Sequence, residues 1–231
     1  MVATRRLMLL IGGASQLGDP LAACVRAMVC AVVVLSLLPG SGAAGAGEAA
    51  AVRAVDRVFP VRGSADYGSA HHDYPATDIF AGCGQPVVAP VRGTVLEVSR
   101  RDRWDAETDR PKDRGGKFVS ILGVDRVRYY GSHLRSLARG AHRGAHVSAG
   151  EMIGRVGRTG NARSTPCHLH FGLSPRCHEA GDWWIRRGVV SPYRYLRSWE
   201  GGGDRSPRHV VRAWRRDHGC QRSAVLGRGT T

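Results

Sequence analysis

The sequence is poor in aromatic residues, poor in acidic residues, and without any apolar run long enough to cross a membrane. Aromatic side chains make up 6% of the 231 residues, whereas glycines number 31, a balance that favours short strands and tight turns over long helices. The main apolar run, Ala27 to Leu38, is too short to span a bilayer. No tandem repeat is present, and a chain of this length buries one ordinary core, so we expect one folded domain.

The short apolar run has instead the pattern of an export signal. Basic residues up to Arg26 precede it, and a tract of small residues that ends at Ala46 follows it. We therefore expect residues 1–46 to be a signal peptide and residues 47–58 to be a short tether. An uncleaved anchor is the alternative. After cleavage no stable membrane span remains, and the mature protein is expected to be secreted or held in the cell envelope.

The shortage of acidic residues leaves a large positive charge. Lysine and arginine number 34 against 19 acidic residues, which gives a formal net charge of +15. Removal of the signal takes away three arginines and one aspartate and leaves +13. An exported protein with this charge attracts polyanions such as anionic wall polymers. The arginines are scattered and no basic stripe interleaved with aromatic residues accompanies them, so nucleic acid is not an expected partner.

Two of the six cysteines lie in the signal, so the mature chain keeps four. An even number of cysteines in an exported protein predicts disulfides. Three pairings are possible. We favour a bond between Cys167 and Cys177, which would clamp the loop after a predicted strand, and this leaves Cys83 to pair with Cys220.

The middle of the mature chain has the pattern of antiparallel β-structure. Short segments that are β-branched or alternate in polarity are separated by Gly, Pro or Asp turn signals, and they span residues 86–91, 93–99, 117–122, 126–130, 152–156 and 167–173. The charged stretch from Arg100 to Gly116 has no apolar period and is expected to form a long hairpin loop. We therefore expect a mainly β fold with an antiparallel sheet core over residues 59–200.

Two segments near the C-terminus predict short helices. Residues 191–199 and 206–214 each begin with Ser-Pro, which places the serine at the N-cap and the proline at the first helical position. In the second segment Val210, Val211 and Trp214 share one helical face. We assign residues 201–231 to a C-terminal helix and tail.

The segment CHLHF contains two histidines one residue apart in an apolar strand. Because side chains alternate along a strand, His168 and His170 face one side while Leu169 and Phe171 face the other. Neutral imidazole binds zinc and titrates near neutral pH, so the pair suits a metal site or a metal ligand beside a proton shuttle. The alternative is a half-exposed strand with two solvated histidines.

Two further segments contain histidine, HHDYPATD from His71 to Asp78 and YYGSHL from Tyr129 to Leu134. A zinc hydrolase needs three protein ligands and an open position for a water molecule, whose pKa the metal lowers to about 7. It also needs one or two imidazoles nearby to move protons and stabilise the oxyanion. Two histidines and an aspartate would supply the three ligands.

In their order, these segments resemble the LytM-like or lysostaphin-type peptidases, the M23 zinc endopeptidases that cut peptidoglycan peptides. The resemblance runs from about Tyr67 to Phe171 through DIFAGCGQPVVAPVRGTV, YYGSHL, VSAGEMIGRVGRTGN and CHLHF. It implies an antiparallel β core with a groove that binds peptidoglycan stem or cross-link peptides. The implied function is that of an exported zinc endopeptidase; the alternative is a non-catalytic domain that binds peptidoglycan or regulates another wall hydrolase.

The resemblance also implies roles for individual residues. Asp78, His170 and an upstream histidine would hold Zn²⁺, and His133 and His168 would be catalytic rather than ligands. We assign the remaining histidines to solvent, namely His142, His146, His178, His209 and His218. Trp183 and Trp184 are expected to pack against the first Ser-Pro helix, with a place in the groove wall as the alternative.

The upstream histidine is where the chain departs from the family pattern. Five residues separate His72 from Asp78 and six separate His71, and both spans are longer than the usual one. Position 74, where the usual pattern has a histidine, is a tyrosine. We choose His72 because the shorter span changes the usual geometry less.

Overall fold

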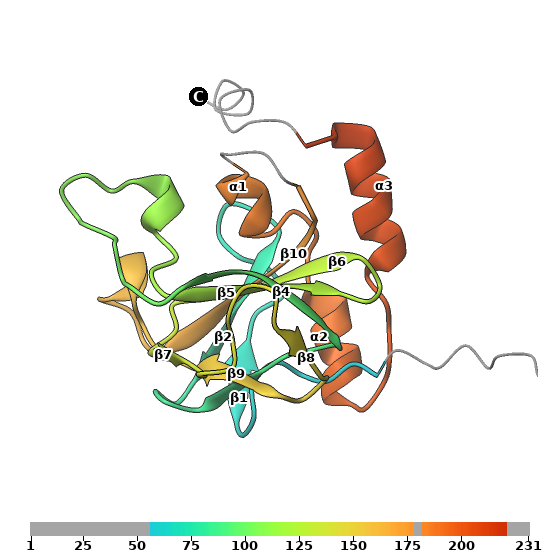
Figure 1. Cartoon of the computed structure of the whole chain (residues 1–231), viewed down its shortest axis with the longest axis horizontal. Helices are drawn as coiled ribbons and strands as arrows, with labels where there is room; N and C mark the ends of the chain where they lie inside the picture. The colour runs from blue at the N-terminus through green and yellow to red at the C-terminus, as the bar shows by residue number, and fades with distance from the viewer. Residues whose placement is uncertain (1–55, 178–181, 221–231) are drawn as a thin grey trace, which may run out of the picture. The chain divides into compact units, whose positions relative to one another are not determined.

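A computed structural model of the protein describes residues 56–177 and 182–220 (Figure 1). The expected signal peptide, most of the expected tether, His178 and the end of the C-terminal tail lie outside the described residues. Within the described ranges, no helix has the length and apolar character needed to cross a membrane.

The described strands form two antiparallel sheets, which confirms the mainly β fold. The larger sheet has the order β1 (Ala65–Tyr67), β2 (Ala76–Ala81), β10 (His168–Pro175), β6 (Val127–Ser132), β5 (Phe118–Gly123), β4 (Gly93–Ser99) and β8 (His146–Val147). The smaller sheet has the order β3 (Pro86–Val88), β9 (Met152–Arg155) and β7 (Ser136–Leu137). All six predicted strands occur, although β3 is shorter than predicted, while β1, β2, β7 and β8 were not predicted.

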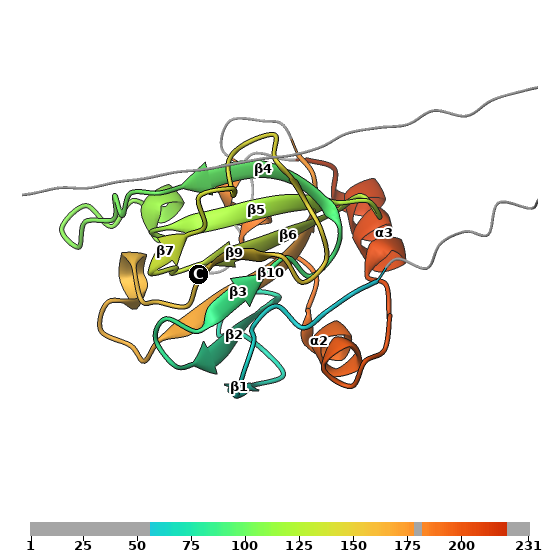
Figure 2. The ribbon, with the colours of Figure 1, turned by 60° about the horizontal axis from the view of Figure 1, so that its bottom comes forward.

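Strand β10 is an interior strand of the larger sheet, between β2 and β6, and all of its residues are buried (Figure 2). It pairs with β2 on one edge and with β6 on the other, and His170 lies opposite Asp78 on β2 and Ser132 on β6. Leu169 and Phe171 belong to the hydrophobic core. The alternation expected for CHLHF is therefore present, with apolar side chains in the core and histidines on the other face.

The predicted hairpin loop, residues 100–116, joins the antiparallel strands β4 and β5 and contains a short 3₁₀ helix, η1 (Pro111–Asp113). Two carboxylates hold the loop in place. Asp109 accepts a hydrogen bond from the Trp104 indole at 2.9 Å, and Asp102 accepts one from the backbone of Gly160 at 3.1 Å. Gly160 begins a second 3₁₀ helix, η2 (Gly160–Ala162), so the charged loop is fixed against the segment that precedes β10.

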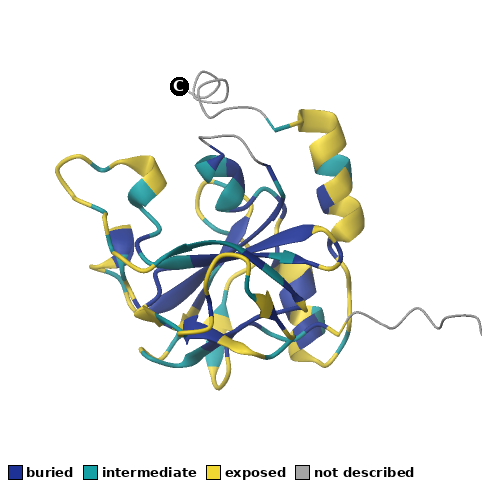
Figure 3. Cartoon of the chain, in the orientation of Figure 1, coloured by how far each residue is buried: buried dark blue, intermediate teal, exposed yellow. Residues whose placement is uncertain are grey.

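Both predicted helices occur, as α2 (Tyr193–Glu200) and α3 (Arg208–His218), and they lie on the same side of the molecule (Figure 2). Their prolines, not the preceding serines, occupy the N-cap positions, which corrects the predicted capping. Most of α3 is exposed (Figure 3). Val211 is buried and Trp214 is partly buried against the core, but Val210 is 42% exposed and does not share their environment.

The disulfides join Cys83 to Cys167 and Cys177 to Cys220, so the favoured pairing was wrong. The reason is the length of β10, which lies between Cys167 and Cys177. An extended strand rises about 3.3 Å per residue, whereas a disulfide requires Cα atoms less than about 7 Å apart. Cys83 follows β2, the antiparallel neighbour of β10, and its Cα atom lies 5.3 Å from that of Cys167.

A buried ion pair ties the start of the domain to the sheet and to the linker before α3. Arg57 donates to Asp125 at 2.8 Å and to Asp204 at 2.7 Å, and the Tyr129 hydroxyl donates to Asp125 at 2.7 Å. Burial alone would lower the pKa of Arg57, but the hydrogen bonds to the two carboxylates outweigh burial and raise it. The cation is therefore permanent, and it needs its buried anion.

We expect Asp125→Asn to reduce the free energy of unfolding by about 3 kcal/mol, because it leaves a buried guanidinium without its fully buried carboxylate. Asp204→Asn is the matched control, since its side chain is 42% exposed and the loss should stay below about 1 kcal/mol. Urea denaturation of both variants measures the difference. Equal losses would contradict the assignment of Asp125 as the principal partner.

Candidate functional site

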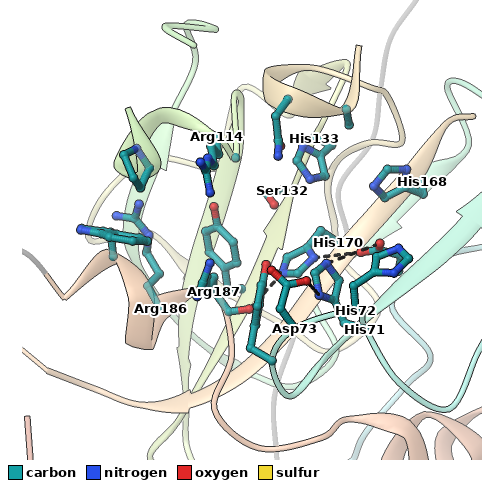
Figure 4. Close-up of a pocket in the computed structure, with 18 of the residues that line it drawn as sticks. His71, His72, Asp73, Arg114, Ser132, His133, His168, His170, Arg186 and Arg187 are labelled. Carbon is teal, nitrogen blue, oxygen red and sulfur yellow. Dashed lines mark hydrogen bonds and ion pairs between the residues drawn. The ribbon is translucent and has the colours of Figure 1, made fainter. Parts of the chain in front are cut away.

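Five of the sequence-predicted site residues and their neighbours line one pocket of about 280 Å³ (Figure 4). The side chains come from the segment before β2, from β2, β6 and β10, from the loop of residues 100–116 and from α1 (Trp183–Arg186). The short helix α1 was not predicted. Strand pairing thus gathers residues that are far apart in the sequence into one cavity.

Three potential metal ligands converge at the base of this pocket. His71, Asp78 and His170 each offer one ligand atom, and these atoms all lie within 4.8 Å of one another. His170 Nδ1 lies 2.8 Å from one carboxylate oxygen of Asp78, and His71 Nε2 lies 3.7 Å from the other. Two imidazoles and a carboxylate form a common donor set for a divalent transition metal.

The hydrogen bond made by Nε2 of His170 shows that Nδ1 is the nitrogen left to bind a metal. Its Nε2–H group donates to the backbone carbonyl of Arg187 at 2.9 Å, and so Nδ1 is the nitrogen that faces Asp78. A lone pair on Nδ1 and a carboxylate oxygen repel each other unless a cation, either a proton or a metal ion, lies between them. A carbonyl that orients the outer nitrogen of a ligating histidine is typical of metal sites. The residues present therefore fit a metal.

Asp78 is charged over the whole physiological range. Burial alone would raise its pKa, but the hydrogen bond and charge of His170 outweigh burial and lower the pKa to about 2. The base of the pocket thus holds a fixed negative charge, which favours a bound cation.

His133 lies at the side of this cluster with its ring nitrogen Nε2 available. Its Nδ1 donates to the Thr159 carbonyl at 2.8 Å, and a carbonyl only accepts, so the neutral ring carries its proton on Nδ1. Burial, followed by repulsion from His170 and His168, lowers the pKa of His133 to about 3. The backbone of His133 has a φ of 63°, a left-handed conformation that is uncommon outside glycine and is often found at functional sites.

His168 is arranged in the same way on β10. Its Nδ1 donates to the Pro166 carbonyl at 2.9 Å, so Nε2 is again the unprotonated nitrogen of the neutral ring. The ring centroids of His133 and His168 are 4.9 Å apart, and that of His133 is 5.9 Å from that of His170. Two imidazole lone pairs therefore lie beside the candidate metal position, where they suit proton transfer.

The structure brings His71 to the cluster and leaves His72 outside it, in contrast to the expectation from spacing. His72 is exposed, and its ring contacts only the edge of the His71 ring, at a centroid distance of 5.5 Å. The difference comes from Tyr74, whose ring packs against His71 at 4.3 Å and whose hydroxyl lies 3.4 Å from His170 Nε2. This packing turns His71 towards Asp78.

The other histidine assignments agree with the structure where it describes them: His142, His146, His209 and His218 are exposed. The tryptophans differ from the expectation. Trp183 lines the pocket, as in the alternative considered for it, and Trp184 packs against Trp214 of α3 at a centroid distance of 6.1 Å.

Sequence reasoning also missed Arg187, whose carbonyl orients His170 and whose side chain lines the pocket. No motif marks this residue, because it contributes through its backbone and follows a helix that was not predicted. The contact depends on Gly172 of β10, where a Cβ atom would lie 2.1 Å from the Arg187 carbonyl oxygen.

Comparisons with known proteins find similarity to peptidases. Residues 72–181 match the family model of peptidase family M23. The L-Ala–D-Glu endopeptidase of Bacillus subtilis (strain 168) is 31% identical over 132 residues, which cover 55% of this chain and 35% of that enzyme. The chain thus spans about a third of the length of this relative.

Solved structures of similar proteins include a Ruminococcus gnavus protein assigned as the glycyl-glycine endopeptidase LytM, with 23% identity and a TM-score of 0.49 over 64% of this chain and 62% of that one. The catalytic domain of the antimicrobial peptidase lysostaphin from Staphylococcus simulans has 25% identity and a TM-score of 0.43, over 59% of this chain and 91% of that domain.

We expect Gly172→Ala to weaken divalent-metal binding by about 10-fold, since the new methyl group would push the Arg187 carbonyl away from His170. Gly140→Ala is the control, because a Cβ atom there would meet nothing within 4 Å. Titration of both variants with Zn²⁺ in a calorimeter gives the affinities. Unchanged binding in Gly172→Ala would mean that the carbonyl does not orient the ligand.

Proposed function

We propose that the protein is an exported zinc metalloendopeptidase that hydrolyses peptide bonds in bacterial peptidoglycan, and the match of residues 72–181 to the model of peptidase family M23 supports this. The observation that carries the proposal is the convergence of His71, Asp78 and His170 in one pocket with the two imidazoles of His133 and His168. The name of the Bacillus subtilis relative, an L-Ala–D-Glu endopeptidase, supports a peptide of the wall as the substrate.

In this proposal His71, Asp78 and His170 hold Zn²⁺ through Nε2, a carboxylate oxygen and Nδ1. When bound, the ion would act as a Lewis acid that activates water and polarises the peptide carbonyl. Asp78 provides the negative charge that offsets the cation, and the Arg187 carbonyl keeps the His170 ring in the orientation that presents Nδ1.

His133 and His168 carry the proton transfers. Each has its Nδ1–H group bonded to a backbone carbonyl, so Nε2 can accept a proton from the attacking water. Once protonated, the same nitrogen can donate to the oxyanion or return the proton to the leaving amine. Because the carbonyls fix both rings, little reorganisation is needed during the reaction.

The disulfides and the net positive charge support a proposed location and further partners for the protein. Both disulfides suit an oxidising compartment outside the cytoplasm, which supports export to the envelope or the medium. The excess of basic residues supports attraction to anionic wall polymers. The substrates proposed are the stem or cross-link peptides of peptidoglycan.

The proposal is tested by incubating the purified, zinc-loaded protein with purified peptidoglycan and identifying released peptides by mass spectrometry. We expect new amino and carboxyl termini at one type of peptide bond, and loss of release after chelation and its return with added Zn²⁺. A zinc-loaded protein that binds peptidoglycan without releasing peptides would instead support the non-catalytic alternative.

The ligand assignment makes opposite predictions for two adjacent histidines. His71→Ala should lower zinc affinity by more than the roughly 10- to 100-fold that the loss of an outer partner costs, because it removes a ligand. His72→Ala should change it little, since His72 is exposed and outside the cluster. Zinc stoichiometry by mass spectrometry and titration distinguishes the two variants, and the reverse result would reassign the ligand to His72.

The roles proposed for His133 and His168 predict that their loss affects turnover but not metal binding. His133→Ala and His168→Ala should each reduce kcat by about 10²- to 10⁴-fold while zinc stays near one per chain. His146→Ala, at an exposed position of β8 outside the pocket, is the control and should retain full activity. A variant of His133 or His168 that keeps its activity would exclude that residue from proton transfer.

A further inference from the structure

Four positively charged lysine and arginine side chains line the pocket, and three of them have a carboxylate partner. The pairs are Lys112 with Asp113 at 3.4 Å, Arg114 with Asp109 at 3.0 Å, and Arg186 with Glu97 at 2.7 Å. The fourth, Arg187, makes no ion pair with any residue that the structure describes. Its Nε–H group is buried and has no hydrogen-bond partner among these residues. A guanidinium that lines a pocket without a carboxylate partner of its own is a candidate binding group for an acidic ligand.

Aromatic side chains hold the Arg187 guanidinium in one orientation. Its central carbon lies 3.7 Å from the centre of the Tyr74 ring and 5.4 Å from that of Trp183. Such contacts use the faces of the guanidinium, whereas its N–H groups lie in its plane and point outward from the edges. The group is therefore preorganised to bind a planar carboxylate through two parallel hydrogen bonds.

The same residue contacts the candidate metal site through its backbone. The Arg187 carbonyl oxygen lies 2.9 Å from His170 Nε2, and the Tyr74 hydroxyl lies 3.4 Å from the same nitrogen. The Arg187 side chain therefore starts beside the candidate metal ligands, and a carboxylate bound by its guanidinium would lie no further from them than the length of that side chain. In Figure 4 the labelled arginines lie on one side of the pocket and His168 on the other, so a bound peptide would extend from a cationic end to the histidines.

We propose that Arg187 is a specificity-determining residue that selects peptides with a free carboxylate on a residue adjoining the scissile bond. This inference rests on the proposed peptidase function and adds the chemical class of the substrate. A carboxylate accepts two N–H groups from the guanidinium edge and offsets its charge, whereas a carboxamide offers one acceptor and turns an NH₂ group towards the cation. The protein should thus distinguish wall peptides that differ only by amidation.

The experiment uses two stem peptides that contain the cleaved bond and differ only in whether the adjoining residue carries a free carboxylate or a carboxamide. For the wild-type protein we expect kcat/KM to be about 10-fold or more higher on the carboxylate peptide. Arg187→Met keeps an apolar stem over Tyr74 but removes the charge. It should lose most of this preference, because kcat/KM should fall much more on the carboxylate peptide than on the carboxamide peptide.

Two further variants complete the test. Arg187→Lys retains a point charge without the planar fork and should keep a reduced preference. Arg194→Met removes an exposed arginine on α2, outside the pocket, and should behave as wild type. Zinc content, measured for every variant, should not change, because the Arg187 contact to His170 is made by its backbone.

The outcomes separate this inference from the proposed function. Cleavage of both peptides at equal rates by the wild-type protein would overturn the role of Arg187 and leave the peptidase function intact. Equal losses on both peptides in Arg187→Met would also overturn it, since they would indicate a structural role for the side chain. Failure of the zinc-loaded wild-type protein to cut either peptide would instead count against the peptidase function itself.

Discussion

The register of β10 between its two neighbours is the constraint on which the site depends. Because His170 lies opposite Asp78 on β2 and Ser132 on β6, side chains from three distant parts of the chain face one cavity. A slip of one residue would turn the histidines into the core and bring Leu169 and Phe171 to the pocket. The burial of those two side chains therefore keeps the candidate metal ligands facing the pocket. The packing of the core thus also fixes the geometry of the site. Covalent bonds fix both of its ends: one disulfide joins Cys167 to the chain that follows β2, and the other joins Cys177 to the end of α3.

Sequence patterns predicted the parts of this arrangement that follow from periodicity. The alternation in CHLHF was enough to place His168 and His170 on one face, and β-branched runs marked six of the strands. They did not mark β2, where Asp78 lies in a short segment that contains alanines at both ends. The predicted disulfide pairing was wrong because pairing depends on which strands are neighbours, and separation along the chain does not reveal this. Topology was the missing information in both cases.

Sequence periodicity could not distinguish His71 from His72 as the candidate ligand. The two residues belong to a segment without regular structure, and adjacent side chains there have no fixed relation to a sheet face. The Tyr74 ring packs against His71 at a centroid distance of 4.3 Å, and His71 is the histidine of the two that lies beside Asp78 and His170. The sequence patterns could not predict the role of Arg187 either, because its approach to β10 depends on contacts between backbones. At Gly188 a Cβ atom would lie 2.7 Å from the Pro75 carbonyl oxygen, so a glycine is needed for the two segments to meet.

These contacts join the longer histidine-to-aspartate span to the cation in the pocket. Tyr74 lies within this span, where its ring packs against His71 and the Arg187 guanidinium lies 3.7 Å from the ring centroid. Its hydroxyl meanwhile lies beside His170 Nε2, where the Arg187 carbonyl also binds. A histidine at position 74 would be a smaller platform for a guanidinium, and when protonated it would repel one. A single tyrosine therefore connects the group that would hold the metal with the group that would recognise the substrate.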